Sequence, residues 1–135
     1  MYLSVLDLET KYLFLDLELY ISKTDGEFND LEKQIIDTHC IEMHIDNNNY
    51  QCELPLSVVY EKLGKCTEEE KRIIFIEMLA VVLADKVYHQ SEKILVDRLA
   101  NILKIKDEDV KKAFAAVEEM KEAYVKFSNF VFNRE

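Results

Sequence analysis

The ten residues Lys23–Glu32, KTDGEFNDLE, stand between two apolar-rich segments and carry the pattern on which the fold depends. Sixty positions later, Ala84–Glu92 reads ADKVYHQSE, so that Asp, an aromatic residue and Glu return at the same offsets. A short acidic turn that recurs between apolar segments predicts two related helical hairpins, packed about a pseudo-twofold axis. The residue pairs related by this shift include Leu19 with Leu79, Asp25 with Asp85, Phe28 with Tyr88, Glu32 with Glu92 and Asp37 with Asp97.

The segment Leu3–Ser22 precedes the first turn and carries two competing patterns. Apolar residues such as Val5, Leu8 and Tyr12 recur in steps of three and four, as on one face of a helix. The leucines from Leu13 to Leu19 also alternate, which is typical of a strand. The length of the segment and its lack of Gly and Pro favour a helix.

Five further helices are predicted from capping signals and periodicity. The first is expected at 29–43, where Asn29 and Glu32 form a capping box, and the second at 56–63, between Pro55 and Gly64. The third begins at Thr67, with Glu70 as its capping-box partner, and runs to about Val87. The fourth runs from His89 or Ser91 to Leu103, and the fifth from a cap at Asp107 through Val131. In the fourth of these, Ile94, Leu95, Leu99, Ile102 and Leu103 are expected to face inward. Residues 41–54 form either a surface loop or a small hairpin, because apolar residues alternate on both sides of an Asn run.

The composition agrees with a helical protein. A chain of 135 residues with only two Gly and one Pro favours long helices over many short strands. We therefore predict an all-α fold, with two related hairpins in a compact bundle of about six or seven helices. A single domain is expected over residues 1–135, with repeat units at approximately 9–44 and 69–104.

The charge and the cysteines narrow the classes of partner and the compartment. Seventeen basic residues against twenty-seven acidic ones give a net charge of −10, which disfavours nucleic acid and anionic membrane surfaces. The longest apolar run, Ile73–Ala84, is too short to span a bilayer, so we expect no direct membrane insertion. Cys40, Cys52 and Cys66 form no CxxC pair and no signal peptide opens the chain, so we expect a cytoplasmic location.

The first candidate site consists of the four repeated carboxylates Asp25, Glu32, Asp85 and Glu92. Carboxylates at such positions accept hydrogen bonds from backbone N–H groups and interact favourably with the positive N-terminal end of the helix dipole. The same oxygen atoms suit a divalent cation, Ca²⁺ or Mg²⁺ before Zn²⁺. Capping alone is the simpler interpretation, and a shared metal site is the alternative.

Two further chemistries have weaker support. Cys40 and His44 lie four residues apart, and Cys52 and Cys66 would complete a zinc site, yet their spacing does not require one. Proton transfer would depend on His89 beside Asp85 and Glu92, without any nucleophile or phosphate-binding motif. We therefore expect no enzyme and no catalytic residue.

The C-terminal segment is more apolar than one helix face requires, since Tyr124, Phe127, Phe130 and Phe132 fall close together. These side chains are expected either to pack on the body of the protein or to form an interface. The second interpretation predicts a homodimer through the last helix, or an unknown protein partner.

The repeated turn, together with the segment Leu95–Ile105 (LVDRLANILKI), resembles the tellurite-resistance TerB-like family over roughly residues 10–120. That family also includes the N-terminal domain of certain membrane-bound DnaJ-like co-chaperones. The matching residues are Asp25, Gly26, Phe28 and Glu32 in the first copy and Ala84, Asp85, Tyr88 and Glu92 in the second, where Lys86 replaces the glycine.

The resemblance implies an all-helical domain of two related hairpins, acidic turn residues that bind metal, and a role in stress response. From it we expect a non-enzymatic binding or adaptor module. A divalent-metal-binding or metal-sensing protein, which would use the same acidic turn residues, is the alternative.

Overall fold

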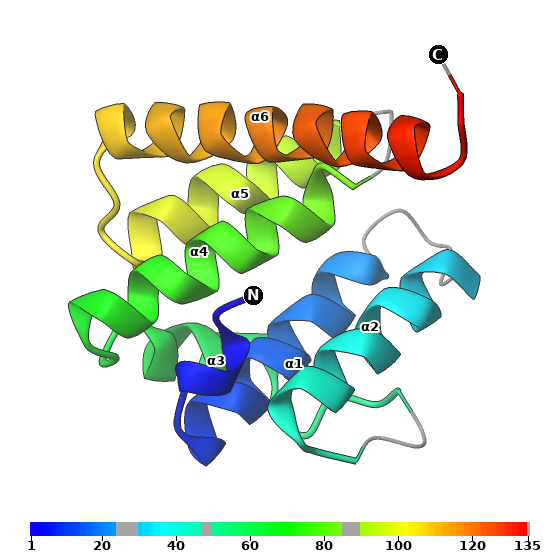
Figure 1. Ribbon diagram of the computed structural model, residues 1–135. Helices are drawn as coiled ribbons and strands as arrows, with labels where there is room; N and C mark the ends of the chain where they lie inside the picture. Colours follow the sequence, from blue (N-terminus) through cyan, green and yellow to red (C-terminus); the bar gives the residue numbers. More distant parts are fainter. Residues whose placement is uncertain (24–29, 47–49, 85–89, 135) are drawn as a thin grey trace.

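The computed structural model describes residues 1–23, 30–46, 50–84 and 90–134, and its regular secondary structure within these ranges is entirely helical, with no strand (Figure 1). This confirms the predicted all-α class and the number of helices. The elements are a short 3-10 helix, η1 (Leu3–Val5), and six α-helices: α1 (Leu8–Ser22), α2 (Asp30–Met43), α3 (Leu56–Leu63), α4 (Glu68–Val82), α5 (Gln90–Ile102) and α6 (Asp107–Val131).

The sixty-residue repeat is visible in the helix boundaries. The helices α1 and α4 each contain 15 residues, and both their first and their last residues lie sixty positions apart. The helices α2 and α5 likewise begin sixty positions apart, at Asp30 and Gln90. Two segments of different sequence therefore form helices of matching extent.

The caps repeat as well. Asp7 accepts a hydrogen bond from the backbone N–H of Thr10, and Thr67, sixty positions later, accepts one from the N–H of Glu70. Just beyond α2 and α5, His44 and Lys104 adopt left-handed conformations, with φ of 57° and 56°. The next residue in each copy donates its N–H five positions back, which closes both helices with the same Schellman-type turn.

The two helix pairs are joined through α1 and α4. The helix α1 packs on α2 and α3, α4 packs on α5 and α6, and α1 contacts α4 in the middle of the bundle. In Figure 1, α6 lies along the outer side of α4 and α5, on the side of the bundle away from α3. The molecule thus consists of two helix pairs, α1 with α2 and α4 with α5, and the long helix α6 lies along the second pair.

The leucines from Leu13 to Leu19 alternate because their helix is buried on nearly every side. Each of them is at most 3% exposed, and Phe14 between them is fully buried. A helix surrounded by neighbours needs apolar residues all round, so its sequence loses the single-face pattern. The strand interpretation of this stretch is therefore wrong.

Several predicted boundaries are corrected. The first segment is not one helix, since Leu6 is extended and Asp7 caps a new start at Leu8. The helix α4 ends at Val82 rather than near Val87. The helix α6 begins at Asp107, whose predicted place as the cap is taken by Lys106 without a side-chain hydrogen bond.

Two other predictions concern α5 and the segment before α3. Ile94 is 50% exposed rather than inward, and Val96 is buried in α5.

The segment 41–54 contains no strand within 41–46 and 50–54, and α2 continues through Met43. Its second part is held by the buried carboxylate of Asp16, which accepts N–H groups from Glu53 at 3.0 Å and Leu54 at 3.2 Å. The hairpin alternative is thus not formed within the ranges described.

No helix in the described part of the chain is long and apolar enough to span a bilayer. The predicted extent of the domain, residues 1–135, stays a prediction.

Candidate functional site

Two of the four predicted carboxylates meet in one small cavity. Glu32 and Glu92 lie in the first turns of α2 and α5, and both line a hollow of about 30 Å³. Apolar side chains from α1, α2 and α4 form much of its wall. The other two predicted residues, Asp25 and Asp85, lie outside the described residues. The structure therefore brings together one glutamate from each repeat.

The cavity has room for a single water molecule or a small ion. Both glutamates are half-buried, and both already make interactions within the protein. Each lies in the first turn of a helix, where the outward-pointing N–H groups attract negatively charged side chains. No group of three or more His, Cys, Asp or Glu side chains suitable for a metal occurs among the residues that the structure describes.

The alternative zinc ligands are not brought together within the described ranges. Cys40 is buried in the core, and burial raises the pKa of its thiol to about 11. Burial also raises the pKa of the half-buried thiols Cys52 and Cys66. Zinc binds thiolates, so these surroundings disfavour a zinc site. The remaining proton-transfer candidates, His89 and Asp85, lie outside the described residues.

A buried ion pair between α1 and α2 was not predicted. Nδ1 of His39 lies 2.7 Å from Oε2 of Glu18, whose side chain is fully buried. Burial raises the pKa of Glu18, although the contact with His39 opposes this. Burial alone would lower the pKa of His39, but its hydrogen bond to Glu18 and the nearby Glu77 and Glu42 keep that pKa above its usual value.

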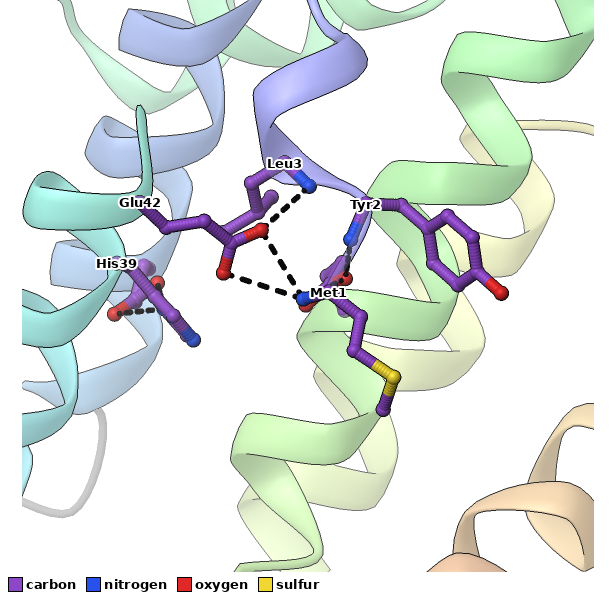
Figure 2. A network of polar contacts seen from close by, with 7 residues as sticks. Met1, Tyr2, Leu3, His39 and Glu42 are labelled. Carbon is purple, nitrogen blue, oxygen red and sulfur yellow. Dashed lines mark hydrogen bonds and ion pairs between the residues drawn. The ribbon is translucent and has the colours of Figure 1, made fainter. Parts of the chain in front are cut away.

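Beside this pair, two carboxylates hold the N-terminal segment (Figure 2). The α-ammonium group of Met1 lies 2.9 Å from Glu77 and 3.1 Å from Glu42. Glu77 also accepts the N–H of Tyr2, and Glu42 accepts the N–H of Leu3. The sequence indicates these buried contacts only through Glu18 and Glu77, each of which is a carboxylate inside an apolar run. These contacts fix η1 against α2 and α4.

The second half of α6 exposes several large apolar side chains close together. Val117 is the one buried residue of this helix, and Lys121 donates a hydrogen bond to the carbonyl of Leu83 at the end of α4. Beyond Lys121 the large side chains are exposed, and in Figure 1 this half of the helix extends past α4. The exposed fractions are 71% for Tyr124, 70% for Phe127, 89% for Phe130, 69% for Val131 and 66% for Phe132. Tyr124, Phe127, Phe130 and Val131 are called the C-terminal aromatic face below.

The first half of α6 borders two adjoining hollows. One, of about 800 Å³, lies between α4, the start of α6 and the N-terminal segment, with Ile73, Phe75 and Ala113 in its wall. The other, of about 360 Å³, continues along α6 past Ala116 to Met120. Tyr2 and Ile76 border both hollows, so the two form one channel, called the α4–α6 groove below.

Part of the chain matches a known protein family. Residues 53–115, which include α3, α4, α5 and the beginning of α6, match the family model of the tellurite resistance protein TerB. Searches of curated proteins and of solved structures found no match. The match is shorter than the resemblance drawn from the sequence, and it contains the second acidic turn but not the first. Residues 53–115 are therefore similar to the tellurite resistance protein TerB family.

Proposed function

We propose that this chain is a non-enzymatic binding or adaptor module of TerB-like type, and that it binds a protein partner through the C-terminal aromatic face. The family match supports the type of module, and the family name connects it with stress response. We place the module in the cytoplasm, where its three free cysteines would stay reduced.

The exposure of α6 is the observation that carries this proposal. Large apolar side chains that gather on one exposed surface mark interaction sites, whereas isolated ones are ordinary. Tyr124, Phe127 and Phe130 are all at least 70% exposed and lie within seven residues of one helix. Aromatic side chains of this kind are the usual anchors of protein interfaces, because they bury much area and lose little conformational freedom.

The test is a comparison of capture by three forms of the chain. We immobilise three forms and compare the proteins that each retains: the wild type, the double variant Phe127→Asp/Phe130→Asp and the control Ile41→Asp. Ile41 is 75% exposed on α2, so its substitution also replaces an exposed apolar side chain with a carboxylate, at a site outside the proposed surface. We expect the wild type and the control to retain the same partner and the double variant to lose it. Equal retention by all three forms would contradict the proposal.

A divalent-cation site is the second candidate, because Glu32 and Glu92 line one cavity at two helix N-termini. Carboxylate oxygens are ligands for Ca²⁺ and Mg²⁺, and in the predicted site Asp25 and Asp85, which lie outside the described residues, would raise the number of carboxylate ligands to four. In this case the ion would be the signal that the protein senses.

Thermal unfolding with and without chelator separates the two candidates. A cation that binds only the native state raises the melting temperature, whereas an adaptor keeps its melting temperature in chelator. Calorimetric titration with Ca²⁺, Mg²⁺ and Zn²⁺ uses the wild type, Glu32→Gln/Glu92→Gln and the exposed control Glu61→Gln. The metal candidate requires heat that the double variant loses and the control retains. Absence of binding heat with all three ions would eliminate it.

A further inference from the structure

We propose that the C-terminal aromatic face of one copy docks into the α4–α6 groove of a second copy, and reciprocally, in an antiparallel homodimer through α6. This inference rests on the proposed function, because it names the partner of the same surface.

The groove and the aromatic face lie on one continuous side of α6. Asp109, Ala113, Ala116 and Met120 follow steps of three and four residues where they line the groove. The same steps continue through Ala123 to Phe127 and Val131. One end of this side therefore borders the open groove beside the body, and the exposed rings occupy the other end.

An antiparallel arrangement makes these two halves complementary. If the helices cross near Met120, residues after it in one copy face residues before it in the other. Phe127 then faces Ala113, and Tyr124 faces Ala116, so that each ring meets a small side chain. Alternation of large and small side chains across a helix contact allows close packing. The apolar wall of the groove, with Ile73 and Ile76 of α4, covers the sides of the rings.

The charge distribution favours a second copy as the occupant. Residues 123–134 contain Lys126 and Arg134 and no carboxylate, although the whole chain carries a net charge of −10. The antiparallel arrangement brings Arg134 beside the acidic first turn Asp107–Asp109 of the other copy. A locally basic segment on an acidic protein is attracted to surfaces like the remainder of that protein.

The rings are numerous enough for a stable interface. Tyr124, Phe127 and Phe130 contribute six aromatic side chains to a twofold dimer, in which each contact occurs twice. At about 150 Å² each, they supply roughly 900 Å², more than half of the roughly 1,600 Å² that a standard interface buries. The groove walls and the apolar part of α6 supply the remainder.

Sedimentation equilibrium of the full chain tests the association. We expect the wild type and Ile41→Asp to form dimers, and Phe127→Asp/Phe130→Asp to dissociate with at least a tenfold weaker association, since loss of two interface anchors has effects of about this size or larger. Circular dichroism checks that the double variant keeps its helices. A wild type that remains monomeric up to about 200 µM, or a double variant that still forms dimers, would overturn the inference.

Disulfide trapping tests the arrangement. Ala113→Cys and Phe127→Cys are made in separate chains, mixed and oxidised, with the wild type as the background from its native thiols. We expect a covalent dimer in the mixture only, because positions 113 and 127 face each other, whereas 113–113 and 127–127 pairs lie about 21 Å apart along the helices, too far for a disulfide.

A covalent dimer from Phe127→Cys alone would show contact between two aromatic faces and would overturn docking in the groove. A monomeric wild type that still captures another protein, or binds anionic lipid vesicles, through the aromatic face would also overturn it. That result would leave the proposed binding surface intact, so failure of the inference is distinguishable from failure of the proposed function.

Discussion

The hydroxyl of Thr10 donates a hydrogen bond of 3.0 Å to Oε2 of Glu70, the residue sixty positions further along the chain. The two residues occupy the same position in α1 and α4, since each donates its backbone N–H to the cap of its own helix. Residues that a twofold rotation exchanges touch only where they lie close to the axis. The contact is thus the one expected if the predicted pseudo-twofold axis passes between the N-terminal ends of α1 and α4.

Substitution of Glu70 tests this contact. Glu70→Ala removes the acceptor for Thr10 and the 2.9 Å hydrogen bond from the N–H of Thr67, which forms half of the capping box. We expect a loss of about 1–2 kcal/mol in the free energy of unfolding, measured by urea denaturation. The neighbouring Glu69→Ala, at an exposed position in the same helical turn, is the control and should change stability much less. Equal losses in both variants would contradict the assignment.

The repeat also predicts equal costs for equivalent core substitutions. Leu19 and Leu79 are 0% and 1% exposed at the same position of α1 and α4. Leu19→Ala and Leu79→Ala should each lower the free energy of unfolding by about 3 kcal/mol, through lost burial and the cavity left behind. Leu8→Ala, at a position 61% exposed, should have little effect. A large difference between the two buried sites would argue against equivalent packing of the two helices.

Asp16 is expected to hold the segment that leads into α3. Its side chain accepts the N–H groups of Glu53 and Leu54, and the residue is 2% exposed. Asp16→Ala leaves both N–H groups without this acceptor, which should cost about 2 kcal/mol or more. Hydrogen exchange at residues 53 and 54 should accelerate, whereas the exposed control Asp97→Ala should leave both rates unchanged. Unaltered exchange in Asp16→Ala would show that the segment is held by other contacts.

The buried pair of Glu18 and His39 predicts how stability depends on pH. The pKa of His39 is raised above its ordinary value of 6.5, so its contribution is fully present below that pH and is lost as pH rises through the folded value. The raised pKa of Glu18 acts in the same direction above 4.5. We therefore expect the free energy of unfolding to fall as the pH rises above 6.5, where the raised pKa values of both groups act together.

Glu18→Gln identifies the source of this dependence. The amide cannot form an ion pair, so the pKa of His39 should fall toward its ordinary value and the loss of stability above pH 6.5 should diminish. An NMR titration of the His39 ring measures the first effect, and denaturation at several pH values measures the second. An unchanged His39 titration in Glu18→Gln would show that Glu42 and Glu77 alone hold the proton.

The helices and their repeat were predictable because they depend on local signals. The capping box of Thr67 and Glu70, and Pro55 and Gly64 at the ends of α3, act within a few residues and are found as predicted. The boundary at Leu6 was missed because Val5, Leu8 and Tyr12 keep a helical spacing across the break. Periodicity alone does not show that Asp7 restarts the helix.

The features that depend on tertiary contacts were less accessible. The sequence marks Glu18 as a carboxylate in an apolar run, but not that His39 of another helix meets it. It likewise gives α6 a long apolar stripe without showing where the body stops covering it, near Lys121. Glu32 and Glu92 line one cavity, and the predicted four-carboxylate metal site stays a prediction.

Hydrogen exchange of the wild type at low and high protein concentration tests the central claim most directly, namely that the second half of α6 is the surface on which one copy of this protein binds another. The account predicts that amides from 118 to 131 become more protected at high concentration, together with residues 73–76 of the groove, while those of α2 do not change. Exchange in α6 that is the same at every concentration, or protection that appears on α2 instead, would contradict it.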